Sequence, residues 1–462
     1  MLRPAPIQDH YDVVIVGGGP AGTTCGHLLA KKGWSVLVVE KAEHPRFQIG
    51  ESLLPFSTRV WDELGVWDQL EASPYARKYG AWFDFQEGDA PEDFCFGGDN
   101  PGRGDWAWNV ERPWLDQMLW NAAVAAGANG IQNTEASFVV DGEGAQATVS
   151  GVDLALPDGT SKRVLARLTI DAAGRGSLLG ARLQIRRPDP RLNMMAMYAH
   201  FTGARVIEGD TGGFIGIIAI ADGWGWVIPF ADGAISVGIV VRNTAFAERV
   251  KGSTPEDVFS AYLAQTPAML NRMGPDVSRT TQVRTTGNYS FRCDTPVGNG
   301  WALAGDAGAF IDPVFSSGVH LAMEGSRRLV QDVDKALRQE ASGLVPAHRM
   351  ARYAAANVRA LKVFSRFIYD WYDDEFRLAF MRPPPKSRLV QLVKRHMLRI
   401  LAGDVYQPWR VLPWMWALEM MAKMNAAGVR RLNGGVLPPP GHAPLVVPGR
   451  PAPPPKLGAD PG

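Results

Sequence analysis

The chain has 462 residues, of which 46% are hydrophobic and 21% charged, proportions that exclude a wholly disordered chain. Its net charge of +1 gives no indication of nucleic-acid binding. Cys25, Cys95 and Cys293 are too far apart for a disulfide framework or a zinc motif, so a cytoplasmic protein without a metal is expected. The first residues lack the order of a signal peptide, and no stretch is apolar for long enough to predict a membrane span.

The N-terminal segment is predicted to form one βαβ unit. Residues 11–16 (YDVVIV) are a continuous β-branched run, typical of a buried parallel strand. A glycine turn at 17–22 leads into a helical pattern from 23 to 32. Residues 35–39 then predict a second strand, which closes with Glu40.

Beyond this unit, strand-like and helical segments alternate. Aromatic and polar residues alternate at 76–110, and residues 190–290 contain several alternating apolar runs, as in antiparallel strands over a pocket. The predicted fold class is therefore α/β, with a nucleotide-binding layer interleaved with an antiparallel substrate-side sheet, plus C-terminal helices. Helices are expected at 114–126, 255–265 and 318–337, a hairpin at 147–156 and 163–171, and a short buried strand at 301–304.

The glycine turn carries the dinucleotide fingerprint in its required place, between a strand and a helix. Gly17 makes the tight turn, Gly19 lets the backbone approach a pyrophosphate, and Gly22 lets helix and strand pack closely. The helix N-terminus adds free N–H groups, and Glu40 stands where a carboxylate can bond a ribose hydroxyl. The cofactor-binding residues predicted from this unit are Gly17, Gly19, Pro20, Ala21, Gly22, Glu40 and Lys41.

Two later segments favour FAD over NAD as the nucleotide. Asp171–Gly174 ends a predicted strand, and Gly305–Ala307 follows the strand at 301–304 and precedes a helix. The second segment resembles a segment of FAD enzymes of the aromatic hydroxylase type, in which an aspartate bonds the ribityl chain. The resemblance gives this role to Asp306 and implies a FAD-binding Rossmann-type fold, GR2/PHBH-like.

Four further motifs are similar to those of the flavin-dependent halogenases, in the branch that acts on phenols and pyrroles. They are Arg46–Pro55 (RFQIGESLLP), Lys78–Phe83 (KYGAWF), Trp224–Pro229 (WGWVIP, a complete WxWxIP) and Phe310–Gly318 (FIDPVFSSG, a complete FxxPxxSxG). Their order and approximate spacing hold across residues 11–335. No single motif is decisive, since geranylgeranyl reductases vary the third and hydroxylases carry glycine at the position of Ser316.

The resemblance implies an enzyme that uses FADH2, O2 and chloride or bromide to form hypohalous acid. Lys78 would receive this acid, as a hydrogen-bond donor or as a transient haloamine, and would halogenate an electron-rich aromatic of secondary metabolism. Trp224 and Trp226 would keep the substrate away from the flavin, which suppresses hydroxylation. The family motifs mark Lys78, Trp224, Trp226, Pro229 and Ser316 as catalytic, and Arg46, Ser52, Arg112, Asp306, Pro313 and Gly318 as FAD-binding.

The loop before the helix at 318–337 also predicts a halide site from its chemistry. A halide needs N–H donors and no competing carboxylate, and a loop that opens a helix offers both. Ser317 and Gly318 are the predicted halide-binding residues. Phe315 occupies the position where tryptophan halogenases place a glutamate, so the resemblance favours a phenol or pyrrole, which activates itself, over free tryptophan.

Two expectations concern the flavin itself. The position that binds FAD covalently in some relatives falls near Arg292, so no covalent link is expected. Because no second GxGxxG is present for a nicotinamide nucleotide, a separate flavin reductase is expected to supply reduced FAD. Two other functions remain open at this point: a hydroxylase or geranylgeranyl-reductase-like oxidoreductase that uses NADPH directly, and a flavin-binding scaffold without activity.

The C-terminal part differs in composition from the predicted core at 1–385. Residues 386–434 form a basic helical segment, in which Leu392, Val393, Met397 and Ile400 recur at helical spacing. The segment is expected to close the pocket, to dock an acidic carrier protein that bears the substrate, or, less in keeping with the family, to contact a membrane surface. Residues 435–462 are rich in proline and are predicted to be disordered.

Overall fold

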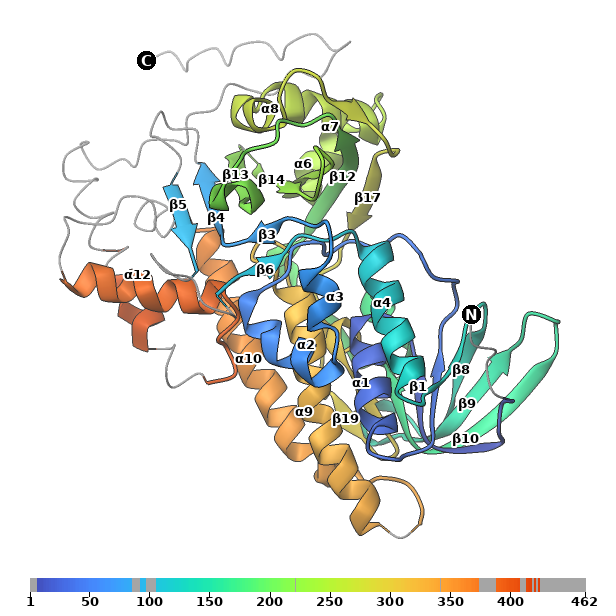
Figure 1. Cartoon of the computed structure of the whole chain (residues 1–462). Coiled ribbons are helices and arrows are strands. Elements are labelled where there is room, and N and C mark those ends of the chain that lie inside the picture. The colour runs from blue at the N-terminus through green and yellow to red at the C-terminus, as the bar shows by residue number, and fades with distance from the viewer. Residues whose placement is uncertain are drawn as a thin grey trace, which may run out of the picture.

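The computed structural model describes residues 6–84, 92–96, 105–220, 222–340, 342–373, 388–407, 413–417, 419–420 and 423 (Figure 1). The predicted proline-rich tail at 435–462 and much of the basic segment at 386–434 lie outside these residues. Among the described helices, none is both long and apolar enough to cross a membrane.

The first layer is a sheet built around the predicted βαβ unit. Its strands lie in the order β19-β20-β10-β1-β2-β7, and β1 is parallel to both β2 and β10. The long strand β10 also pairs antiparallel with β9, which forms the predicted hairpin and pairs in turn with β8. The strands are β1 (His10–Val16), β2 (Val36–Val39), β7 (Asn129–Ile131), β8 (Glu135–Asp141), β9 (Thr148–Ala155), β10 (Ser161–Asp171), β19 (Val297–Gly298) and β20 (Trp301–Leu303).

Helices cover this sheet because each presents an apolar stripe to it. Helices α1 (Pro20–Ala30), α4 (Arg112–Ala125) and α9 (Ser317–Gln339) pack together over one face, and their buried side chains share one core with β1 and β10. Two short helices, α2 (Thr58–Leu64) and α3 (Trp67–Glu71), extend the same core. The predicted helices at 114–126 and 318–337 match α4 and α9 to within two residues.

The second layer is a sheet that the chain enters twice between strands of the first, which confirms the predicted interleaving. The strand order is β16-β12-β15-β14-β13-β4-β5, with β17 beside β12. Its pairs are antiparallel except for β4 with β13, which are parallel because they come from separate visits of the chain. The strands are β4 (Gly80–Asp84), β5 (Glu92–Cys95), β12 (Met194–Thr202), β13 (Ile215–Ile220), β14 (Gly223–Pro229), β15 (Ile235–Arg242), β16 (Ser278–Arg279) and β17 (Arg284–Gly287).

Smaller elements complete the fold. A two-stranded sheet pairs β3 with β6, so the region 76–110 forms two separate pieces of sheet instead of one. These elements are β3 (Arg77–Lys78), β6 (Ala107–Trp108), α5 (Leu178–Arg182), β11 (Arg186–Pro188), α6 (Asn243–Arg249), α7 (Pro255–Ala264), α8 (Pro267–Met273), β18 (Phe291–Cys293) and β21 (Ala309–Phe310).

Two C-terminal helices close the second layer, as Figure 1 shows in orange and red. Helix α10 (Ala351–Trp371) packs against α9, and α12 (Arg388–Leu401) lies against the end of α10. Val393, Met397 and Ile400 of α12 are buried, whereas Leu392 is exposed and lies beside this stripe. Helix α10 was not predicted, although its buried residues recur every three or four positions.

Candidate active site at the sheet edge

The carboxyl ends of four parallel strands bring the predicted cofactor segments to one edge of the first sheet. Val16 at the end of β1 pairs in register with Val39 of β2 and with Asp171 of β10, and Asp171 pairs with Leu303 of β20. The glycine turn and the segments after Val39, Asp171 and Leu303 therefore leave the sheet side by side. Ligands bind at this edge in open parallel α/β sheets.

The three fingerprint glycines differ in what surrounds them. A Cβ on Gly17, whose φ is +115°, would lie 2.3 Å from the carbonyl oxygen of Ala172, and one on Gly22 would lie 1.9 Å from that of Gly17. These two glycines are thus required by the protein's own backbone. The nearest atom to a Cβ on Gly19 is instead Arg46 Nη2, at 3.7 Å. The open space over Gly19 is the cradle that a pyrophosphate needs.

Glu40 closes the turn from the side. Its carboxylate accepts hydrogen bonds from the backbone N–H of Gly18 at 2.8 Å and of Ala42 at 3.0 Å, and Arg46 Nη2 lies 3.2 Å away. Burial acts to raise the pKa of Glu40, but the Arg46 charge and these donors outweigh it and hold the pKa below its ordinary value. The neighbouring Lys41 is exposed.

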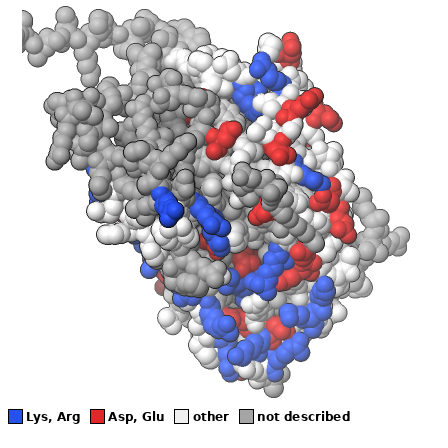
Figure 2. Space-filling model, turned by 60° about the vertical axis from the view of Figure 1, so that its left-hand side comes forward, with Lys and Arg blue, Asp and Glu red and all other residues white. Residues whose placement is uncertain are grey.

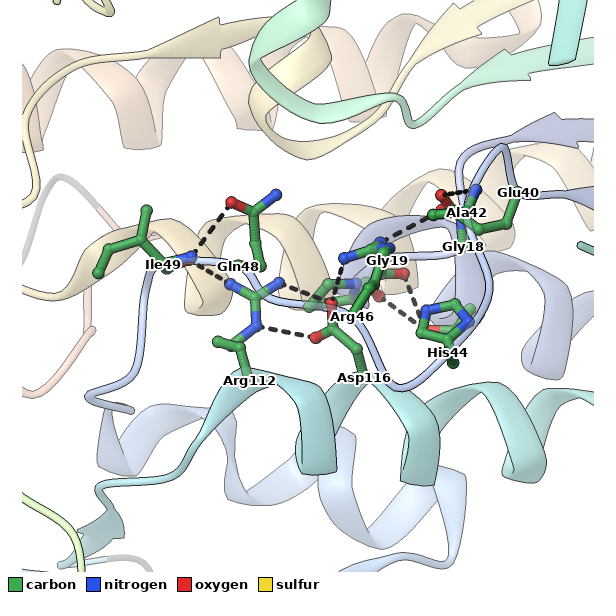
Figure 3. A network of polar contacts seen from close by, with 12 residues as sticks. Gly18, Gly19, Glu40, Ala42, His44, Arg46, Gln48, Ile49, Arg112 and Asp116 are labelled. Atoms are coloured by element: carbon green, nitrogen blue, oxygen red, sulfur yellow. Dashed lines mark hydrogen bonds and ion pairs between the residues drawn. The ribbon is translucent and has the colours of Figure 1, made fainter. Parts of the chain in front are cut away.

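The two arginines predicted to contact FAD share one carboxylate, Asp116 (Figure 3). Arg46 donates to Asp116 Oδ2 at 3.0 Å, and Arg112, in the first turn of α4, donates to both oxygens at 2.8 and 3.0 Å. Asp116 is fully buried. It therefore fixes both guanidinium groups beside the glycine turn, a role that the sequence analysis missed.

Unsatisfied polar atoms at this edge fit a polar cofactor. Arg46 Nε and Ser52 Oγ are buried and have no hydrogen-bond partner among the described residues. Burial also raises the pKa of Asp306 to about 6, against the opposing charges of Arg175 and Arg112. Buried polar groups in folded proteins are normally paired, so these atoms point to a bound group. Together with the open cradle over Gly19, they fit FAD.

The predicted halide loop has an unusual backbone. Ser316 adopts a left-handed conformation, with φ of +56°, and its N–H bonds to the carbonyl of Pro313 at 3.0 Å. This conformation favours glycine, the residue that hydroxylases carry at this position, so a serine here is strained. Helix α9 begins at the buried Ser317, which places the positive end of a 23-residue helix at the loop. A Cβ on Gly318 would lie 3.9 Å from Asp306 Oδ1.

Lys78 is buried, with a side chain that is 1% exposed. Its ammonium donates a hydrogen bond of 3.1 Å to the carbonyl oxygen of Leu53, within the Gly50–Pro55 motif, and lies 5.3 Å from the centre of the Phe96 ring. Within the described part of the chain, no carboxylate pairs with Nζ. Burial lowers the pKa of Lys78 to about 7, so the amine is partly neutral near neutral pH.

The other motifs meet in one aromatic core beside Lys78. Trp224 and Trp226 lie on the same face of β14 with ring centres 5.7 Å apart, and the half-buried Pro229 ends this strand. Phe315 lies 4.5 Å from the Phe367 ring of α10, between ring centres. Leu54, Phe83, Trp224, Trp226, Phe315, Phe367, Trp371 and Met397 belong to this core, and Phe96 packs against it. Residues from all four family motifs thus belong to one apolar core.

Several residues at the site gave no sequence signal. Glu51, inside the Gly50–Pro55 motif, bonds His200 of β12 at 2.6 Å and joins the two layers. Asp312 is buried between motif positions and bonds Tyr372, which follows α10. Such pairs connect residues far apart in the sequence, so only the folded chain identifies them. The 3.6-residue periodicity at 351–371 would have predicted α10, the helix that Tyr372 follows.

Comparisons with known proteins point to the same cofactor. The family "FAD binding domain" matches residues 10–358. The chain is 30% identical to the flavin-dependent halogenase armH4 of Armillaria mellea, over 73% of this chain and 68% of that protein. It is 33% identical to a tryptophan 2-halogenase of Chondromyces crocatus, over 68% of this chain, and spans 59% of that protein's length.

One relative and one solved structure match over nearly the whole chain. A 1H-pyrrole-2-carbonyl-[peptidyl-carrier protein] chlorinase of Pseudomonas fluorescens is 28% identical over 91% of this chain and 93% of that protein. The structure of the myxobacterial chondrochloren halogenase CndH has a TM-score of 0.73 and 26% identity, over 92% of this chain and 90% of that one. The fold, the FAD cradle and these relatives together show that the chain is a FAD-containing oxidoreductase and belongs to the flavin-dependent halogenases.

Proposed function

We propose that this enzyme halogenates an electron-rich aromatic, a phenol or a pyrrole, and that Lys78 delivers the oxidised halogen. The observation that carries the proposal is the burial of Lys78 with a backbone carbonyl as its polar partner. Burying a lysine without a carboxylate is unfavourable, so such a residue points to function. Its amine, with a pKa of about 7, is available both as a donor and as a nucleophile.

Other residues of the site support separate roles for halide binding, for shielding of the flavin and for halogen transfer. Bound FAD, supplied in reduced form by a separate reductase, provides hypohalous acid from O2 and halide. The N-terminus of α9, with Ser317 and Gly318, holds the halide through backbone N–H groups. Trp224 and Trp226 of β14 pack in the same core as Val314 and Phe315, which directly precede Ser316. Lys78 then holds the halogen beside the aromatic core, in which a planar substrate would be accepted.

The choice of a phenol or pyrrole rests on Phe315. Its ring packs against Phe367 and Trp371, so the position offers no carboxylate to polarise the lysine species or accept the ring proton. A ring that carries its own hydroxyl or N–H donates electron density and needs less assistance. We therefore expect phenols and pyrroles to react faster than tryptophan, and a tryptophan rate equal to theirs would contradict this choice.

The test is a mass-spectrometric assay with the holoenzyme. It contains FAD, a flavin reductase with NADH, air and bromide, and a panel of phenols, resorcinols, pyrroles and tryptophan. We expect a brominated product, recognised by its isotope doublet, which is lost in Lys78→Ala and kept in Lys251→Ala, a matched exposed lysine. A product that gains one oxygen instead, or halogenation by Lys78→Ala at the wild-type rate, would overturn the proposal.

A carrier-bound substrate is a second candidate, favoured by the carrier-protein chlorinase among the relatives. Arg388 and Arg395 of α12 are exposed at the helix that closes the aromatic core. On the face drawn in Figure 2, basic and acidic side chains otherwise intermingle over the lower end of the molecule. A basic helix at the substrate side suits an acidic carrier protein.

This candidate predicts that binding of an acylated carrier protein weakens with salt and in Arg395→Glu. Arg352→Glu, which makes the same charge change at an exposed position near the start of α10, is the control. Equal binding by both variants, or binding that salt leaves unchanged, would remove the carrier from the proposal and leave a free substrate.

A further inference from the structure

A buried chain of hydrogen bonds connects Trp224 to the C-terminal part of the protein. Trp224 Nε1 donates to the hydroxyl of Tyr372 at 3.0 Å, and that hydroxyl donates to Asp312 Oδ2 at 2.9 Å. The hydroxyl of Tyr289 reaches the same oxygen at 3.4 Å. The backbone N–H of Val314 donates to Asp312 Oδ1 at 3.0 Å. Asp312 is therefore held on both oxygens, and it fixes the direction of the Tyr372 hydroxyl.

The two tryptophans of the WxWxIP motif differ in how their indole groups are held. Trp226 donates to Ser236 Oγ at 3.1 Å, a residue of the adjacent strand β15. Trp224 depends instead on Tyr372, which directly follows α10 and lies beyond the FAD-binding match at 10–358. The sheet therefore holds the Trp226 indole, whereas the residue after α10 holds the Trp224 indole.

The bond to Tyr372 decides the orientation of the Trp224 ring. An indole N–H can only donate, and Trp224 is 2% exposed, so water cannot replace the tyrosine. Leaving such a donor unpaired costs about 1–3 kcal/mol, enough to favour another ring orientation. Tyr372 accepts this bond while its own proton goes to Asp312, which sits inside the FxxPxxSxG motif. One hydroxyl thus ties a motif tryptophan to the loop that precedes the halide site.

We infer that Tyr372 is a positioning residue that holds the Trp224 indole in place, so that docking of α10 sets the barrier between the flavin and the substrate. The barrier itself rests on the proposed function, whereas the positioning of the ring does not. When the Tyr372 hydroxyl is absent, the ring of Trp224 is free to turn, and oxidised halogen escapes or reacts before it reaches Lys78.

The first measurement follows the indole N–H directly in the FAD-loaded protein labelled with 15N in its tryptophan side chains. Trp224→Phe assigns the Trp224 signal by its loss. We expect Tyr372→Phe to shift or broaden this signal. Tyr369→Phe is the matched control, because Tyr369 lies in the last turn of α10, three residues before Tyr372, and its hydroxyl bonds Asp189 instead. A Trp224 signal that is unchanged in Tyr372→Phe overturns the inference, whatever the enzyme's activity.

The second measurement is the yield of halogenated product per FADH2 consumed, in the assay described above. We expect Tyr372→Phe to lower this yield several-fold and raise peroxide or free hypohalite, with unchanged affinity for FAD. Adding Tyr372→Phe to Trp224→Phe should lower the yield no further, since both act through one bond. Tyr289→Phe, which removes a donor to Asp312 and leaves the bond from Trp224 to Tyr372 in place, should have a smaller effect.

The two measurements separate the inference from the proposed function. A shifted indole signal with wild-type yield would show that the ring is positioned by Tyr372 and would overturn its link to the barrier. Absence of halogenated product in the wild-type protein would contradict the proposed function, and the indole signal would still decide whether Tyr372 positions Trp224. If Tyr372→Phe does not fold, Asp312→Asn provides the same test, because it weakens the acceptor that orients the Tyr372 hydroxyl.

Discussion

The ammonium of Lys78 and the carbonyl of Leu53 are 3.1 Å apart, in a place where the lysine side chain is 1% exposed. Leu53 belongs to the Gly50–Pro55 motif that follows the cofactor edge, and Lys78 belongs to β3, 25 residues later. The bond therefore joins the FAD side of the molecule to the aromatic core. It also holds Nζ in one position, which a residue that transfers a halogen requires.

Lys78→Met should abolish halogenation while FAD binding and oxidation of FADH2 continue. Methionine keeps an unbranched apolar side chain that is only one heavy atom shorter, so the core stays nearly filled. It offers neither a donor nor a nucleophile. Product formation should fall by at least a hundredfold, measured by mass spectrometry, with peroxide formed in its place. Lys251→Met should behave as the wild type, and product from Lys78→Met at a comparable rate would exclude Lys78 from the reaction.

The same substitution should stabilise the protein near neutral pH. The pKa of Lys78 falls from 10.5 to about 7 on folding because burial disfavours its charge. At pH 7 the unfolded chain holds this proton more tightly, and each pKa unit corresponds to about 1.4 kcal/mol. Losing the bond to Leu53 offsets about 1 kcal/mol or more of the gain. Chemical denaturation at pH 7 should show Lys78→Met more stable than the wild type by about 3 kcal/mol. Equal or lower stability would mean that the buried amine is not destabilising.

The product yield and the stability of the wild type should both change with pH in a direction set by Lys78. Because the pKa of Lys78 is about 7 in the folded protein, the neutral amine becomes dominant as the pH rises above that value. If the halogen passes through a haloamine, product per FADH2 should increase with pH across this range and then level off. Stability should also rise between pH 7 and 10, where the unfolded chain still binds the proton. A yield that falls with pH would favour the charged ammonium as a hydrogen-bond donor to hypohalous acid.

Two glycine substitutions should separate folding from cofactor binding. In Gly22→Ala the new Cβ would lie 1.9 Å from the carbonyl oxygen of Gly17, so the protein should lose several kcal/mol of stability. In Gly19→Ala the Cβ enters open space at an ordinary φ of −82°, so the apoprotein should keep its melting temperature. Its affinity for FAD should nevertheless fall about tenfold or more, because the methyl group occupies the pyrophosphate cradle. Fluorescence titration and thermal unfolding measure both, and wild-type affinity in Gly19→Ala would place the cofactor elsewhere.

Removing the carboxylate between the two arginines should lower both the stability of the protein and its affinity for FAD. Asp116→Ala removes the carboxylate that pairs with the buried Arg112 and leaves Arg46 with Glu40 alone, so we expect a loss of about 3 kcal/mol. FAD affinity should fall as well, because both guanidinium groups lose their fixed positions. The exposed pair of Asp153 with Arg163 is the control, since Asp153→Ala should change stability by less than about 1 kcal/mol. Similar effects of the two substitutions, measured by denaturation, would contradict a structural role for the Asp116 cluster.

The elements that the sequence predicts are those held by contacts between residues close together in the chain. The strand at 11–16, the glycine turn and the helix after it depend on neighbours within a few residues, and all three are present. The order of strands in the second sheet is different. Strand β4 lies parallel to β13, which is more than 130 residues later in the chain. No local sequence pattern predicts this pairing. The long helix α10 was not predicted, although its buried residues recur at helical spacing, because this segment contains none of the family motifs.

The chemistry that we propose for this protein can be derived from its sequence alone, which has a dinucleotide turn, a lysine, two tryptophans and a serine loop in an order typical of the flavin-dependent halogenases. Residue types and local spacing are enough for that, because each motif is a short stretch of chain. The environment of those residues follows from the folded chain: the burial that lowers the pKa of Lys78, the sharing of Asp116 by two arginines, and the bond from Trp224 to Tyr372. Burial and pairing depend on segments that lie far apart in the sequence and meet only when the two layers and the C-terminal helices pack.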